Sequence, residues 1–216
     1  MHGLRRPAQK GLANGMLHKS EAFLDAHPFG TVPAAFSPDG TIGIFESNSI
    51  MRLVARLGGA RTQLSGDGPY LTSRVDSFLD ASLVFSIELQ RYILALRSGE
   101  NYRKTHRAAR NALETYLAGI EHALRPDRSY LVGRSMTIAD ICFICDLAIL
   151  ANESLHASVL AQDGLEAIAC PELALNYPLA FGHFCRLCRE PAFATDLATY
   201  RDKLALPPFC RSLAGP

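Results

Sequence analysis

The spacing of apolar residues along the chain changes near residue 60. Before that point, short apolar runs such as 41–45 lie between turn residues such as 37–40, which is the pattern of strands joined by a hairpin. After residue 70, apolar residues recur every three or four positions, which is typical of amphipathic helices. The pattern therefore predicts a small domain with strands, followed by a helical domain.

The first of these regions is ordered as two strands and a helix. A strand is entered through Val32-Pro33, a hairpin turn is expected at Asp39-Gly40, and a second strand ends at Glu46-Ser47. A helix is predicted directly afterwards, over residues 48–57. Together these elements predict a compact β-β-α unit.

Long helices are predicted after residue 69. Residues 70–97 contain neither Gly nor Pro, and residues 102–124 carry a clear apolar stripe with charged residues on the other positions. Two further helices are expected near the end of the chain, at about 178–189 and 191–204. The second domain is therefore predicted to be a helical bundle.

Thr137 and Asp140 have the spacing of a capping box, in which each side chain accepts a hydrogen bond from the backbone of the other residue. This predicts the start of another helix, from Ile141 to about Leu150. Because that segment is apolar on nearly every face, we expect it to be the buried central helix of the bundle.

Composition and charge exclude several classes of protein. The 216 residues are 48% hydrophobic, enough for a sizeable core, and 22 basic side chains balance 21 acidic ones. We therefore expect no nucleic-acid or membrane partner chosen by bulk charge. Without an apolar run of about 18 residues or a secretory h-region, a cytoplasmic protein is expected. The basic first 20 residues leave organelle targeting as an alternative.

Six cysteines include two C-x-x-C pairs, Cys142/Cys145 and Cys185/Cys188, whose spacing is also found in zinc sites. A zinc knuckle needs a tight turn, but both pairs lie in segments with helical patterns. On a helix, residues three apart share a face, and free cysteine packs as a small hydrophobe. We therefore expect reduced structural thiols and no metal.

Three short segments before residue 60 carry candidate chemistry: His18-Lys19, residues 29–33 and residues 45–50. Taken singly, the first is a pair of solvated side chains, the second a turn and the third a helix N-cap. Because the three segments follow one another along a single β-β-α unit, we interpret them together.

The chain resembles the glutathione transferase superfamily, on the stretches HKSEAFLDAHPFGTVPAAF, FESNSI and SMTIAD. The first stretch is most similar to phi-class transferases and to the transferase-like region of the gamma subunit of elongation factor 1B. The resemblance implies an α/β plus all-α architecture. A truncated thioredoxin-like glutathione-binding domain would span 1–60, a linker 61–68, and an all-helical glutathione-transferase C-terminal domain 69–216.

The resemblance implies the central contacts to glutathione. Val32 precedes a proline, Pro33, that is cis in the family, and the Val32 backbone would pair with the cysteinyl unit of the tripeptide like an added strand. The carboxylate of Glu46 would attract the γ-glutamyl ammonium. Ser47, with the helix N-terminus, would accept the γ-glutamyl carboxylate.

The same carry-over assigns the remaining site residues. His18 and Lys19 would meet the glycine carboxylate of glutathione as cationic or donor groups. Thr31 occupies a position that is often Gln or Lys in the family, so its implied contribution is smaller. Thr137 and Asp140 match the helix-capping motif of the family, which implies a role in folding.

Thiol activation is the missing part of this site. A free thiol has a pKa of about 8.5, so an enzyme must stabilise the thiolate, and the family does this with a Ser, Tyr or Cys near the first strand. Residues 1–19 contain no Ser, Thr, Tyr or Cys. They are also fewer than the roughly 30 residues of a β-α-β unit, so we expect that half of the domain to be absent or replaced.

Two functions follow from the resemblance. The first is conjugation of glutathione to a small hydrophobic electrophile, with the activity reduced or lost for want of a thiol-activating group. The second is a non-catalytic protein-interaction module of the elongation factor type. In either case the resemblance implies a homodimer, with glutathione as substrate or ligand.

Overall fold

The computed structural model describes residues 4–7, 16–58, 63–125, 128–193 and 195–197, and of residues 4–7 and 16–18 it describes the backbone alone. The chain divides into two compact units, which we call the first unit (Met1–Thr62) and the second unit (Gln63–Pro216).

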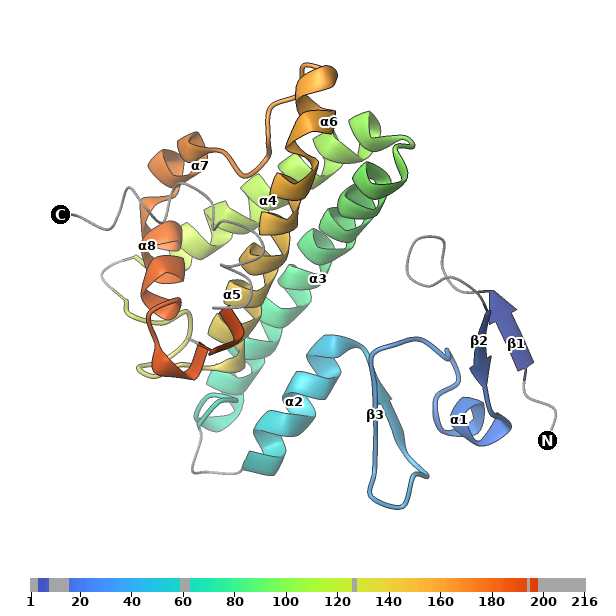
Figure 1. The fold of residues 1–216 in the computed structure, drawn as a ribbon. Helices are drawn as coiled ribbons and strands as arrows, with labels where there is room; N and C mark the ends of the chain where they lie inside the picture. Colours follow the sequence, from blue (N-terminus) through green and yellow to red (C-terminus); the bar gives the residue numbers. More distant parts are fainter. Residues whose placement is uncertain (1–3, 8–15, 59–62, 126–127, 194, 198–216) are drawn as a thin grey trace. The chain divides into compact units, whose positions relative to one another are not determined.

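The described residues of the first unit form two antiparallel hairpins and two helices (Figure 1). Its elements are β1 (Leu4–Pro7), β2 (Met16–Lys19), α1 (Glu21–Ala26), β3 (Ala34–Phe36), β4 (Gly43–Phe45) and α2 (Ser47–Gly58). The last three are the predicted β-β-α unit. The hairpin of β1 and β2 was not predicted, because the segment rich in Gly and Pro gives no alternating pattern.

The turn between β3 and β4 is closed by short polar side chains. The Asp39 carboxylate accepts hydrogen bonds from the Thr41 backbone N–H at 3.1 Å and from the Ser37 hydroxyl at 2.5 Å. Gly40 has a φ of 76°, a left-handed conformation that glycine adopts without steric cost. The hairpin is thus fixed by the local sequence at the predicted position.

The second unit is a bundle of long helices followed in the chain by shorter ones (Figure 1). Its elements are α3 (Gly68–Ser98), α4 (Tyr102–Ala123), α5 (Ile138–Leu150), η2 (Ala151–His156), α6 (Ala157–Gln162), α7 (Pro171–Asn176) and α8 (Pro178–Leu187). Helix α3 packs along α4 and α5, and α8 contacts α4 and α5. Of the predicted helix at 191–204, residues 191–193 and 195–197 are described and helical, and the rest lies outside the described residues.

Helix α5 is the core of this bundle. Ten of its 13 residues are buried, including Phe143 and Ile144, which confirms the predicted central helix. Around it lie large buried side chains from α3, α4 and α8: Phe85, Leu89, Tyr92, Leu113, Leu117, Ile120, Phe181 and Phe184. None of the described helices combines the length and the apolar character needed to cross a membrane.

The predicted capping box at the start of α5 is confirmed. The Thr137 hydroxyl accepts from the Ala139 N–H at 3.3 Å, and the Asp140 carboxylate accepts from the Thr137 N–H at 2.9 Å. Asp140 also accepts from the Leu131 N–H at 3.0 Å and lies 2.8 Å from His183 Nε2 on α8. Asp140 therefore fixes the preceding loop and a neighbouring helix as well as the cap.

The segment after α5 is held by a buried carboxylate. Glu153 in η2 is 1% exposed. It accepts hydrogen bonds from the Tyr92 hydroxyl at 2.6 Å and from the backbone N–H groups of Ile168 and Ala169, both at 2.8 Å. This set of hydrogen bonds ties a segment without a regular apolar pattern to α3.

Candidate functional site

The β3–β4 hairpin brings two of the predicted segments to the same end of the hairpin. Ala34 on β3 pairs with Phe45 on β4, so the residues just beyond this pair, Pro33 and Glu46, lie at the same end of the hairpin. The Val32–Pro33 peptide bond is cis, and the Val32 side chain is 68% exposed. A ligand approaching this end can reach the backbone of Val32 and the start of α2.

Glu46 forms the sharp corner between β4 and α2. Its φ is 65°, in the left-handed region, and its carbonyl accepts the Ile50 N–H at 3.0 Å, which opens the first turn of the helix. The side chains of Glu46 and Ser47 are both exposed. The N–H groups of a first helical turn have no partner within the helix, and they carry the positive end of its dipole. The corner thus offers a carboxylate beside a set of donors.

Lys19 reaches the loop that precedes the cis peptide. Its ammonium donates a hydrogen bond to the Gly30 carbonyl. Gly30 has a φ of 58°, and a Cβ placed there would lie 2.8 Å from Leu24 Cδ2, so a larger residue would be strained at this turn and would displace the end of the Leu24 side chain. The backbone of His18 pairs with Arg5 in the first hairpin, and its side chain lies outside the described residues.

His27, which the sequence analysis did not single out, is buried at the centre of this arrangement. It is 0% exposed and follows the last residue of α1. Its Nε2 lies 3.1 Å from the Thr31 backbone nitrogen and 2.9 Å from the Thr31 carbonyl oxygen. Its ring stacks on Phe45, with centroids 4.8 Å apart and planes 5° apart. No spacing rule finds such a residue, because its role depends on tertiary contacts.

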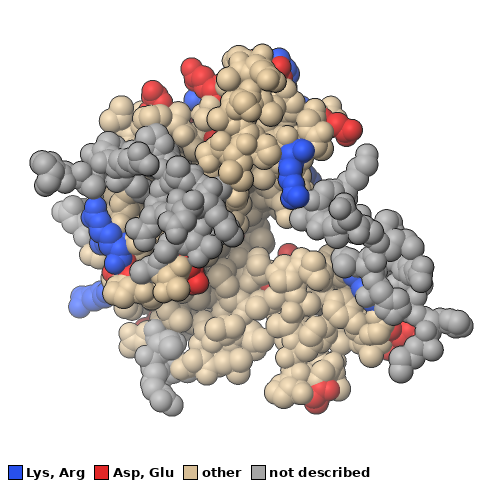
Figure 2. All heavy atoms as spheres, in the orientation of Figure 1, with Lys and Arg blue, Asp and Glu red and all other residues tan. Residues whose placement is uncertain are grey.

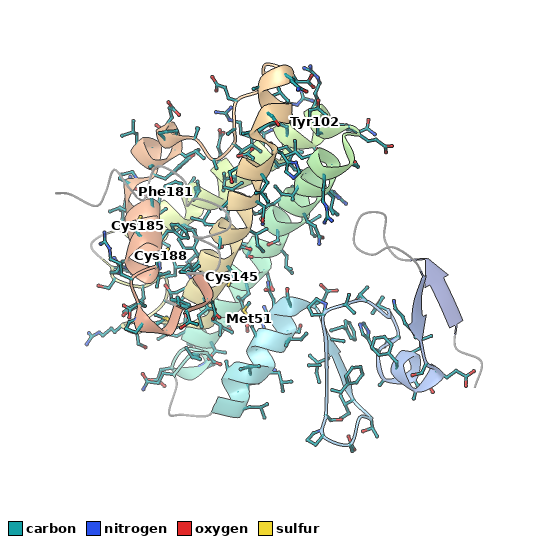
Figure 3. All side chains as sticks on the ribbon, in the orientation of Figure 1. Met51, Tyr102, Cys145, Phe181, Cys185 and Cys188 are labelled. Carbon is teal, nitrogen blue, oxygen red and sulfur yellow. The ribbon has the colours of Figure 1, made fainter. Side chains whose placement is uncertain are left out.

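Both cysteine pairs lie on helices or at their ends, as predicted. Figure 3 labels Cys145 on α5, and Cys185 and Cys188 at the end of α8. Cys142 is buried, and burial, with the nearby Asp146 carboxylate, raises the pKa of its thiol to about 12. Within the described residues, no three His, Cys, Asp or Glu side chains gather as a metal site would require.

The second unit carries an open cavity of about 750 Å³ at the start of α3 and the loop before α5. Its lining includes Arg128 and Arg134 together with Asp67. Over the face shown in Figure 2, acidic and basic side chains are interspersed, in keeping with a formal net charge of +1. The residues predicted for glutathione binding are all in the first unit and do not line this cavity.

Comparisons with known proteins support one family. Residues 83–169 match the model of the glutathione S-transferase C-terminal domain. A probable elongation factor 1-gamma 1 of Arabidopsis thaliana is 27% identical over 93% of this chain and 45% of its own length. The chain spans less than half the length of this and similar curated relatives.

Solved structures share the fold. Glutathione S-transferase isozyme E7 of Drosophila melanogaster superposes with a TM-score of 0.60 at 21% identity, covering 89% of this chain and 78% of its own. Ure2p in complex with glutathione superposes with a TM-score of 0.56 at 16% identity, covering 82% and 79%. These likenesses confirm the predicted fold class, a thioredoxin-like domain followed by an all-helical one. Residues 83–169 thus belong to the glutathione S-transferase C-terminal domain family, and the chain as a whole is similar to elongation factor 1-gamma proteins and shares the fold of glutathione S-transferases.

Proposed function

We propose that the first unit binds glutathione at the end of the β3–β4 hairpin. One observation carries the proposal: exposed Val32, next to a cis peptide, and exposed Glu46-Ser47, at a helix start, lie at the same hairpin end. The tripeptide has matching chemistry, namely a peptide backbone flanked by an amino-acid head and a terminal carboxylate.

The cysteinyl unit and the γ-glutamyl end of glutathione would each find a complementary group in this arrangement. The Val32 backbone would pair with the cysteinyl unit as a strand edge pairs with an added strand. The Glu46 carboxylate would bind the γ-glutamyl ammonium. The Ser47 hydroxyl and the first N–H groups of α2 would bind the adjacent carboxylate.

Lys19 would bind the glycine carboxylate of glutathione. Its ammonium has three donors, and one of them is used by the Gly30 carbonyl, which holds the side chain at the loop. His18 would assist from the neighbouring position on β2. Thr31 would contribute less to binding, because its backbone N–H and its hydroxyl already lie within hydrogen-bonding distance of His27 Nε2.

Conjugation to a small hydrophobic electrophile is the reaction that such a site would serve. It requires thiolate, of which a free thiol provides only a few per cent at neutral pH. The proposed contacts hold the backbone and the charged groups of glutathione, and none of them is assigned to the sulfur. We therefore expect conjugation of a generic aromatic halide to stay near the uncatalysed rate. Turnover far above that rate would contradict this expectation.

Retention on immobilised glutathione tests the binding proposal. The folded wild-type chain should be retained and eluted by free glutathione, and the double variant Glu46→Ala/Ser47→Ala should elute early. A matched control is Ser98→Ala/Glu100→Ala, which removes an exposed Ser and an exposed Glu from the second unit and should be retained like the wild type. Passage of the folded wild type without retention would contradict the proposal.

A second candidate function is a protein-interaction module of the elongation factor 1-gamma type. It is favoured by curated relatives that are 27% and 29% identical over 93% and 90% of this chain and carry that name. We expect the tagged chain to co-purify with other elongation factor 1 subunits, identified by mass spectrometry. Val84 and Ile87 on α3 are exposed apolar residues, and they offer a surface for contact with a partner. A homodimer through the same surface stays a prediction. Co-purification with no such subunit would count against this candidate.

A further inference from the structure

We infer that His27 is a positioning residue, which holds the loop before the cis peptide against the strand that ends at Glu46. The inference rests on the proposed glutathione site and concerns how that site keeps its shape. His27 itself is fully buried, so it would touch no ligand. It would act through its neighbours on both sides of the site.

The first contact is with the loop. His27 Nε2 can accept a hydrogen bond from the Thr31 N–H at 3.1 Å or, in the other tautomer, donate one to the Thr31 carbonyl at 2.9 Å. Thr31 precedes Val32, whose backbone is proposed to pair with glutathione. In either tautomer, one ring nitrogen fixes the residue next to the proposed pairing edge.

The second contact is with β4. The His27 ring stacks on Phe45, which directly precedes Glu46. Gly43 on the same strand lies so close that a Cβ there would be 2.3 Å from the Ala26 carbonyl oxygen and 3.1 Å from His27 Cβ. The close approach of β4 to the end of α1 therefore fixes the ring between the loop and the strand.

The second ring nitrogen, Nδ1, indicates that the role of His27 goes beyond packing. His27 Nδ1 is buried and has no hydrogen-bond partner among the described residues. An unpaired buried polar atom carries a free-energy cost. A phenyl ring would fill the same space and stack on Phe45 without that cost. The hydrogen bond of Nε2 to Thr31 is what a phenyl ring would lose.

Two substitutions separate positioning from packing. His27→Phe keeps the ring and removes the bond to Thr31, so we expect glutathione affinity to fall about tenfold while the free energy of unfolding stays equal or rises. His27→Gln places an amide near the position of Nε2 and should recover most of the affinity. The measurements are calorimetric titration with glutathione and urea unfolding. The control His106→Phe removes a buried histidine bonded to the Glu166 carbonyl at 2.8 Å and should keep the wild-type affinity.

Wild-type affinity in His27→Phe, or equal losses in the Phe and Gln variants, would overturn the inference. His27→Leu replaces the Phe variant if that variant does not fold. Absence of binding by the wild type would defeat the proposed function instead. In that case hydrogen exchange of the Thr31 amide decides: faster exchange in His27→Phe supports positioning, and an unchanged rate contradicts it.

Discussion

Asp146 is a buried carboxylate in the interior of the helical unit. One of its oxygens accepts from the Ser82 hydroxyl at 2.6 Å and the other from the Ser86 hydroxyl at 2.9 Å, which links α5 to α3. Burial raises the pKa of this carboxyl to about 6, although these hydroxyls act in the opposite direction. At neutral pH the ionised form is therefore kept at a cost to stability.

Titration of the Asp146 carboxyl makes the stability of the fold depend on pH. Because the folded pKa lies above the unfolded value, the folded chain binds more protons, and this group makes stability fall as pH rises from about 4 to 6. Asp146→Asn removes the titration. The stability of the variant relative to the wild type should therefore rise by about 2 kcal/mol between pH 4 and pH 7, measured by urea unfolding. A difference that is constant with pH would contradict this.

Single buried polar residues were the hardest features to predict. Asp140 was found because capping has a fixed spacing, but its contacts with His183 and the Leu131 N–H come from residues 43 and 9 positions away. Asp146 and His27 gave no signal at all. Their partners lie across tertiary contacts, and no local pattern records such contacts.

The start of α5 carries the clearest stability prediction among the helices. Asp140→Ala would leave the Leu131 and Thr137 N–H groups and His183 without their buried acceptor, which should lower the free energy of unfolding by about 3 kcal/mol or more. Thr137→Ala loses a cap and should cost about 1 kcal/mol. Chemical unfolding measures both losses.

A suitable control for these two variants is Thr115→Ala, at an exposed position on α4 where the hydroxyl bonds to the Asn111 carbonyl of its own helix. It should change the free energy of unfolding by less than about 0.5 kcal/mol. If Asp140→Ala costs no more than this control, the role given to the capping box and its extended contacts is wrong.

Long helices were predictable from the sequence, and the short helices of the second unit were not. The apolar repeats predicted α3 and α4 to within a few residues, because a long amphipathic face repeats its signal many times. Between α5 and α8 no element was predicted, but the structure has η2, α6 and α7 there. These short helices are stabilised by contacts such as those of Glu153, so their own sequences carry little information.

The two units provide different kinds of evidence about function. The match to the family model lies entirely in the second unit, at residues 83–169, whereas the residues proposed to bind glutathione lie in the first. The order of segments in the sequence predicted the hairpin that brings Pro33 and Glu46 together, and the structure has that hairpin. The ligand assignments themselves stay predictions.

An NMR titration of the labelled chain with glutathione tests whether the β3–β4 hairpin binds this ligand. We expect saturable shifts of the Lys19, Val32 and Ser47 amides, with amides in the interior of α4 unchanged. The double variant Glu46→Ala/Ser47→Ala should weaken the response. A folded wild-type chain that shows no saturable shift, or shifts confined to residues of the second unit, would contradict glutathione binding at the β3–β4 hairpin.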